Sequence, residues 1–260
     1  METGAKPRNR PVVVARDLTI HDLRVALASG WRDYLAHPLF GLFFAAFYVA
    51  GGLILLFGLV SVGRGWWLIP VMAGFSLFAP FSAVGLYAVS SQHESGTDPR
   101  WSVVLGALKG HDDDQLLTMG GIIFVAFSFW MILAHGVFAI FMGESGIGFD
   151  GTGLALSFEA LGMLLVGSLV GGLFALGLFS ITVVSLPMLV DQEVDFITAI
   201  ITSLSVYGNN KRVMTIWALV IATALALAML PLFAGLLVIL PVLGHATWHL
   251  YRRAVALGHT

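Results

Sequence analysis

The sequence of 260 residues contains no cysteine and few charged residues. Charged side chains make up 11% of the chain and hydrophobic ones 58%, whereas soluble domains average about 25% charged and about 45–50% apolar residues. This composition excludes a soluble enzyme and a disordered chain. The absence of cysteine excludes disulfides, thiolate metal sites, iron–sulfur clusters and covalently attached haem. The net charge of −2 provides no electrostatic basis for binding nucleic acid.

Five long stretches lack Asp, Glu, Lys and Arg, namely 34–63, 65–93, 115–143, 160–190 and 213–251. A membrane-spanning helix needs about 20 apolar residues, and a helix satisfies its own backbone hydrogen bonds in lipid. The first four stretches each fit one helix. The fifth is too long for one helix and carries Pro231 near its middle. Because proline breaks or kinks helices, the fifth stretch predicts two helices, at about 213–229 and about 232–251, which makes six spans.

The positions of the basic residues predict the orientation of these six spans. Of the 13 Lys and Arg residues, all except Arg64 fall on one side of the membrane. The positive-inside rule therefore predicts a multi-pass protein of the inner membrane with both termini in the cytoplasm. Aromatic residues near the predicted interfaces are candidate membrane anchors: Trp66 and Trp67 on the outer side, and Trp31, Trp101, Trp248 and Tyr251 on the inner side.

Three short segments on the predicted cytoplasmic face, 19–34, 98–109 and 195–207, have the pattern of amphipathic helices. In the first segment, Leu23, Leu27, Trp31 and Tyr34 share the apolar face, and Asp33 lies off it. In the second, Asp98 suits the N-cap position. The third has an isoleucine-rich face with Thr202 elsewhere on the helix.

Each of these segments leads into a pair of spans, so one unit is used three times, at about 19–92, 97–190 and 194–254. We therefore predict an all-α, six-span transmembrane helical bundle with three cytoplasmic-face amphipathic helices. It forms a single membrane domain over residues 19–260, preceded by a flexible cytoplasmic N-terminus over residues 1–18.

Several stretches of the sequence are similar to a known family. They are Leu189–Asp195, Ala199–Ser203, Pro241–Arg252 and Gly30–Asp33. Pro38 follows the last of these a few residues later. The chain resembles the bacterial integral-membrane family catalogued as domain of unknown function 2189, from about residue 20 to about residue 253. Gly-His-Ala-Thr-Trp-His, at 244–249, is the most specific part of the resemblance. The family implies six spans in a bacterial inner membrane and supplies no established activity. Some members carry names that link them to respiratory oxidase subunits.

Histidines are the main candidates for binding chemistry. His245 and His249 are four residues apart and so share a helix face, and His37 begins the first span. Together they form a weak candidate cluster for haem or a metal ion. The alternative, which we favour, is that they bond to lipid headgroups or neighbouring helices, so we predict no cofactor and no metal. His111–Asp114 has oxygen ligands for a divalent cation, but three acids before a span also complement a helix dipole.

Small residues mark one predicted span as a packing helix. Gly167 and Gly171 form one small-xxx-small pair, and Ser168 and Gly172 form a second pair beside it. Such residues let transmembrane helices approach closely. The span over 160–190 is therefore expected in the bundle core or at a self-association face.

No Asp, Glu, Lys or Arg lies inside a predicted span, which argues against ion-coupled transport. No motif for nucleophilic, phosphate-binding or zinc chemistry appears. We predict a non-enzymatic accessory or scaffold protein that binds membrane lipid, another membrane protein or a copy of itself. A transporter or channel for an uncharged or lipidic substrate is the alternative, and a haem- or metal-binding respiratory accessory subunit is a further one.

Overall fold

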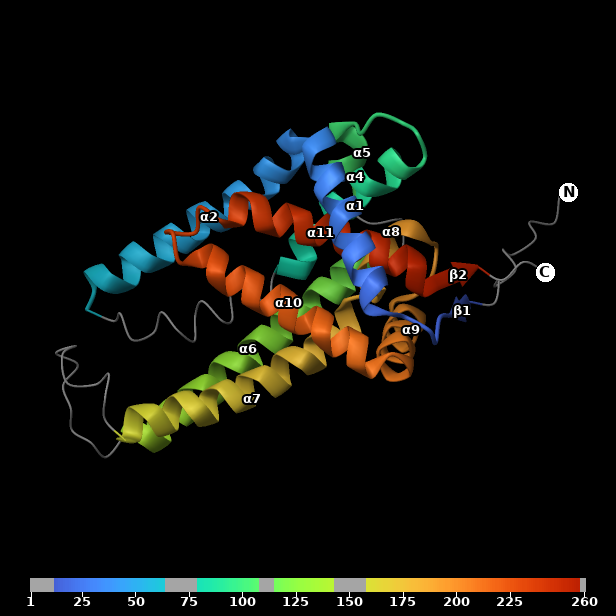
Figure 1. Cartoon of the computed structure of the whole chain (residues 1–260). Helices are drawn as coiled ribbons and strands as arrows, with labels where there is room; N and C mark the ends of the chain where they lie inside the picture. The colour runs from blue at the N-terminus through green and yellow to red at the C-terminus, as the bar shows by residue number, and fades with distance from the viewer. Residues whose placement is uncertain (1–11, 64–78, 108–114, 143–157, 258–260) are drawn as a thin grey trace, which may run out of the picture.

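The computed structural model describes residues 12–63, 79–107, 115–142 and 158–257. Figure 1 shows a bundle of helices with both described ends of the chain on the same side. The all-α fold class is confirmed, because the described part contains two short strands and is otherwise built from helices. The elements are β1 (Val12–Val14), α1 (Ile20–Ala36), α2 (Pro38–Ser61), α4 (Ala79–Glu94), α5 (Trp101–Ala107), α6 (Gln115–Met142), α7 (Phe158–Thr182), α8 (Ser185–Asp191), α9 (Phe196–Asn209), α10 (Lys211–Met229), α11 (Leu236–Ala254) and β2 (Val255–Leu257).

Within the described residues, four helical stretches are long and apolar enough to cross a membrane: Pro38–Ser61, Gln115–Phe141, Ala160–Asp191 and Lys211–Met229. They coincide with four of the six predicted spans. The structure describes the predicted span over 65–93 only from Ala79 onward. Helix α11 occupies the place of the sixth predicted span but is not among these four stretches. Multiple membrane crossings are therefore supported, whereas the count of six stays a prediction.

The predicted break in the long apolar stretch after residue 213 is confirmed. Helix α10 ends at Met229 and α11 begins at Leu236. Between them, Leu232 and Phe233 have positive φ angles of 51° and 64°, which an α-helix does not contain. The chain therefore turns back, and α10 and α11 lie side by side (Figure 1).

Helix α11 packs against α1, α2, α4 and α10 (Figure 1). Its close contacts depend on glycine. A Cβ atom on Gly30 of α1 would lie 2.5 Å from the backbone nitrogen of Ala246, and one on Gly244 would lie 2.7 Å from Cδ1 of Leu86 in α4. Because these glycines carry no side chain, the α1 and α11 backbones touch, and α4 packs directly on α11.

Helices occupy all three segments that the sequence predicts as short amphipathic helices, with two differences in detail. Helix α1 has the expected start, since the Thr19 side chain accepts a hydrogen bond from the Asp22 backbone. Its buried face, however, consists of Leu23, Ala26, Gly30, Asp33 and Tyr34. Trp31, which shares the predicted apolar face with Leu23 and Tyr34, is 45% exposed. Helix α5 begins at Trp101, after the predicted N-cap at Asp98.

Helix α9 turns its polar side inward. Ser203 is fully buried, where its hydroxyl donates to the Ser180 carbonyl and accepts a hydrogen bond from the Val184 backbone nitrogen. These contacts satisfy backbone groups at the break between α7 and α8, which precedes Pro187. Ile197 and Ile201 are more than half exposed. The part of the apolar face that carries Ile197 and Ile201 is thus turned away from the protein, whereas Phe196 and Ile200 pack against the core.

The two described ends of the chain are joined. Strands β1 and β2 pair antiparallel, with Val13 opposite Ala256. Asn210 is buried and its side chain bonds to the Leu18 nitrogen and the Ala15 oxygen. Residues 12–18 belong to the segment for which we predict flexibility, and the sequence does not predict these contacts.

Candidate functional site

A cluster of polar side chains surrounds Asp33, which is only 5% exposed. One carboxylate oxygen of Asp33 lies 2.7 Å from the Ser90 hydroxyl and 2.8 Å from Nε2 of His249, and the other lies 2.9 Å from Nδ1 of His93. Ser90 also lies 2.7 Å from Nδ1 of His245. This Asp33 cluster joins α1, α4 and α11.

The short contacts in the Asp33 cluster determine where the protons lie. An ionised carboxylate only accepts hydrogen bonds, so His93 Nδ1, His249 Nε2 and the Ser90 hydroxyl all donate to Asp33. Because Ser90 has a single proton, it must accept a hydrogen bond from His245 Nδ1. Nε2 of a neutral His245 then carries a lone pair, and it is buried without a hydrogen-bond partner among the described residues.

Asp33 is ionised despite its burial. Burial raises the pKa of a carboxyl group, but the hydrogen bonds from His249 and Ser90 outweigh it and lower the pKa of Asp33 from 3.8 to about 2. A buried charge that accepts three hydrogen bonds is costly to leave without its partners. The cluster therefore fixes the positions of α1, α4 and α11 relative to one another.

The structure brings the predicted histidines to one region, although not as a three-histidine group. His245 and His249 reach Ser90 and Asp33, and the His37 ring packs edge-on against His93 at 5.0 Å. Within the described ranges, no three His, Cys, Asp or Glu side chains are placed to hold one metal ion. Haem or metal binding stays an untested alternative, and His111–Asp114 lies outside the described residues.

A second polar group holds the C-terminal end of α11. Trp248 donates to Glu94 at 3.0 Å, and the Tyr251 hydroxyl donates to Asp191 at 2.6 Å. Arg252 forms ion pairs with both acids. Trp248 and Tyr251 are each 1% exposed, so these two predicted anchors bind protein neighbours, not lipid.

The other predicted interfacial anchors lie at different places. Trp31 and Trp101 are 45% and 40% exposed, which leaves part of each side chain accessible to a membrane. Trp66 and Trp67 lie outside the described residues.

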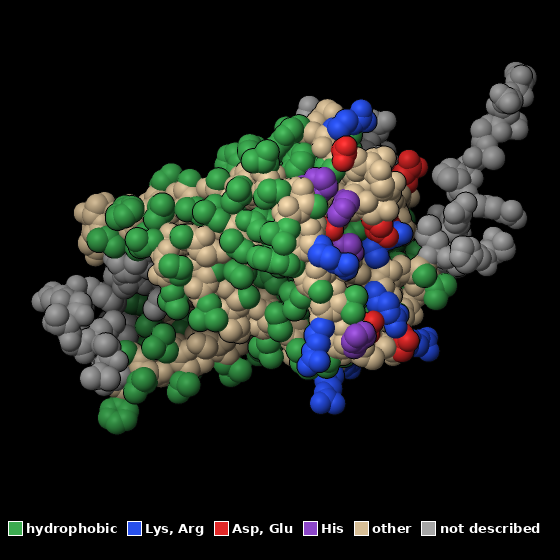
Figure 2. Space-filling view, turned by 45° about the horizontal axis from the view of Figure 1, so that its top comes forward, with side chains coloured by type: hydrophobic (Ala, Val, Ile, Leu, Met, Phe, Trp, Pro, Cys, Tyr) green, Lys and Arg blue, Asp and Glu red, His purple; other side chains and the backbone are tan. Residues whose placement is uncertain are grey.

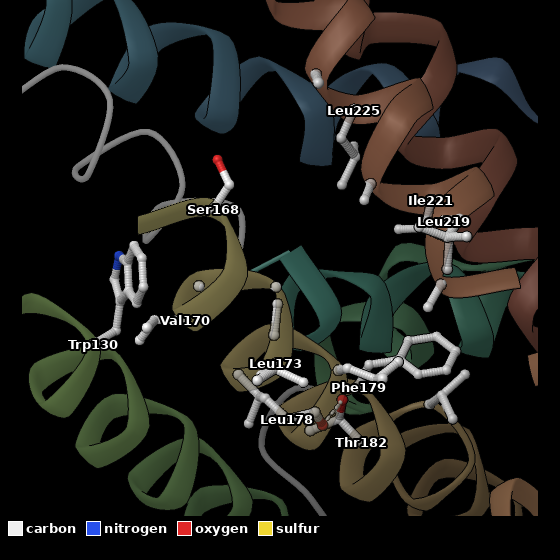
Figure 3. Close-up of a pocket in the computed structure, with 18 of the residues that line it drawn as sticks. Trp130, Ser168, Val170, Leu173, Leu178, Phe179, Thr182, Leu219, Ile221 and Leu225 are labelled. Carbon is white, nitrogen blue, oxygen red and sulfur yellow. Dashed lines mark hydrogen bonds between the residues drawn. The ribbon is translucent and has the colours of Figure 1, made fainter. Parts of the chain in front are cut away.

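A cavity of about 1030 Å³ lies between α4, α6, α7, α10 and α11. Figure 3 shows Trp130 of α6, Leu173 of α7 and Leu225 of α10 around it. No Asp, Glu, Lys, Arg or His is among the described residues that line it. Three lining leucines, Leu169, Leu173 and Leu219, are more than 60% exposed on the outside of the bundle. The cavity is thus apolar and open to the surroundings of the helices.

The predicted small residues of α7 all border the cavity, and two of them also face α6. A Cβ atom on Gly171 would lie 2.7 Å from the ring of Trp130, so this glycine lets α7 approach α6. A Cβ atom on Gly167 would lie 3.8 Å from Cγ1 of Val137 in α6. A Cβ atom on Gly172 has open space around it, and Ser168 and Gly172 both line the cavity.

Several apolar helices around a buried polar cluster and an apolar cavity define a multi-pass integral membrane protein. The chain matches the model of the family described as "Predicted integral membrane protein (DUF2189)" over residues 68–191, which confirms the family resemblance over that part of the chain. The match includes Ser90 and His93 but ends before His245 and His249. No curated protein and no solved structure matches the chain.

Proposed function

We propose that this protein is a non-enzymatic membrane protein that binds a lipid in the apolar cavity beside α7. The cavity is the observation that carries the proposal. Its described lining contains no ionisable side chain, and exposed leucines border it on the outside. Lipid hydrocarbon matches such a lining, because no charged protein group is desolvated when the chain enters.

Filling the cavity tests lipid binding. Gly172 lines the cavity and has no atom within 4 Å of its Cβ position, so Gly172→Phe adds a ring at the cavity from a position with room for its Cβ atom. We expect this variant to lose most of the lipid that co-purifies with the wild-type protein in mild detergent, as measured by mass spectrometry of the extracted lipid.

Gly177→Phe is the matched control. Gly177 lies in the same helix and also has open space around it, but it does not line the cavity. The control is expected to retain the lipid. Equal lipid content in wild type and Gly172→Phe would contradict the proposal. If the protein moves lipid in proteoliposomes, the proposed function would instead be that of a transporter.

We also propose that the protein crosses the cytoplasmic membrane six times, with both termini and the three short helices on the cytoplasmic side. Figure 2 supports one charged end, because acidic, basic and histidine side chains gather at one end of the face it shows and hydrophobic side chains cover the remainder. The exposed Ile197 and Ile201 of α9 suit contact with lipid at that side.

The absence of cysteine makes this topology simple to test. Val62, after α2, and Asp98, before α5, are both exposed. In intact cells, a membrane-impermeant maleimide is expected to label Val62→Cys and to leave Asp98→Cys unlabelled until the membrane is permeabilised. The reverse pattern would refute the orientation.

A further inference from the structure

The polar residues of the cavity gather at one end. Four polar residues line this end of the cavity, namely Tyr87, Thr182, Thr215 and Thr247. Along the chain, each lies within about two helical turns of a charged residue at a helix end, namely Glu94, Asp191, Lys211 and Arg252 in the same order. The opposite end is lined by apolar residues such as Met163, Phe138 and Met229, with the exposed Ser168 between the two. The cavity therefore has a polar and an apolar end.

Three of the four polar side chains at that end already have partners. Thr182 donates to the Leu178 carbonyl and Thr247 to the Leu243 carbonyl, each at 2.8 Å. Thr215 shares a hydrogen bond of 3.0 Å with the hydroxyl of Tyr207. The donors of Thr182 and Thr247 are thus already used, and the Thr215 hydroxyl is already paired with Tyr207.

Tyr87 differs from the threonines. It is 3% exposed and lines the cavity, and its hydroxyl makes no hydrogen bond within the described part of the chain. Its ring stacks on Trp248 at 6.5 Å, and Trp248 is held by Glu94. A ligand that fills the cavity covers this hydroxyl, and a covered hydroxyl without a partner costs about 1–3 kcal/mol. The Tyr87 donor therefore favours a ligand that supplies an acceptor.

We propose that the ligand of the cavity is an uncharged lipid whose polar end carries a hydroxyl or carbonyl oxygen that accepts a hydrogen bond from Tyr87. Its hydrocarbon extends along α7 towards Met163. The inference rests on the proposed lipid binding and adds the class of lipid. A phospholipid is disfavoured because its charged headgroup finds no ionisable partner in the described lining.

The test uses the purified full-length protein and a photoreactive diacylglycerol. Three competitors are compared: unlabelled diacylglycerol, phosphatidylglycerol with the same acyl chains, and octadecane, which has no oxygen. We expect diacylglycerol to compete best. In Tyr87→Phe, diacylglycerol should lose about five- to tenfold in affinity, as expected for one hydrogen bond, while competition by octadecane is unchanged.

Tyr34→Phe is the matched control, because Tyr34 is also buried but does not line the cavity. It is expected to bind all three competitors like wild type. Equal competition by diacylglycerol and phosphatidylglycerol, or unchanged diacylglycerol affinity in Tyr87→Phe, would overturn the inference while leaving lipid binding intact. If the photoreactive lipid labels wild type and Gly172→Phe equally, the proposed function itself fails.

Discussion

At the residue scale, the most informative side chain is Asp33. Its place in the sequence suggests a solvated charge, because it lies off the apolar face of an amphipathic helix. In the structure it is buried and bonded to Ser90, His93 and His249. A carboxylate becomes stable in the interior only when such donors surround it. The donors are 57 to 216 residues away in the chain, so local pattern does not reveal them.

Asp33→Asn tests the energetic role of this cluster. The amide keeps the size of the side chain but removes the charge that three donors require, so we expect a loss of about 1–3 kcal/mol in the free energy of unfolding at neutral pH. Thermal unfolding in detergent measures it. Asp98→Asn is the control, since Asp98 is exposed and has no hydrogen bond or ion pair with any described residue. Equal stability of the two variants would contradict a structural role for Asp33.

The difference in stability between wild type and Asp33→Asn is also expected to depend on pH. The pKa of Asp33 is lowered to about 2 in the folded protein, from 3.8. Its stabilisation is therefore complete above about pH 4 and lost as the pH falls towards 2. The difference in stability between wild type and Asp33→Asn should narrow over that range. A difference that stays constant down to pH 2 would show that the carboxylate charge is not the cause.

At the element scale, the contact between α1 and α11 decides which helix face is buried. Leu23 and Tyr34 of the predicted apolar face are buried, and the buried face also includes Gly30, whereas Trp31 is exposed. The reason is steric, because the α11 backbone approaches so closely that only glycine fits. Period and apolarity reveal that α1 is a helix, but its rotation depends on a partner helix more than 200 residues later.

Gly30→Ala tests this contact. The added methyl group would meet the nitrogen of Ala246 and the oxygen of Val242 at 2.5 and 2.6 Å, and neither backbone atom can move alone. We expect a loss of about 1–3 kcal/mol in stability, as for other overpacked sites. The control is Gly58→Ala in α2, where nothing lies within 4 Å, and its stability is expected to be unchanged or slightly raised. A stable Gly30→Ala protein would argue against the close approach.

At the scale of the whole molecule, the two described ends of the chain are connected to each other and to α9. Arg253 forms ion pairs with Asp17 and Asp22, and Asn210 binds the backbone on either side of Asp17. These contacts hold residues 12–18 against the helices.

Asn210→Ala is expected to release this segment, because it removes the bonds to Leu18 and Ala15. Hydrogen exchange of residues 12–18 should become faster, while exchange in α6 and α7 is unchanged. Asn209→Ala changes the neighbouring exposed residue and serves as the control. Equal exchange rates in both variants would show that Asn210 does not hold the segment.

The sequence alone determined the membrane class, the helical fold, the extent of four spans and the break near Pro231, because these depend on local composition and on backbone chemistry. The helix positions of the three short amphipathic segments were also predictable from their period. Only the tertiary structure decided that Asp33 is buried, that Trp248 binds Glu94, and that the small residues of α7 line a cavity while Gly171 also packs on α6. Each of these depends on which distant side chain or backbone lies opposite, and that follows from how the helices pack.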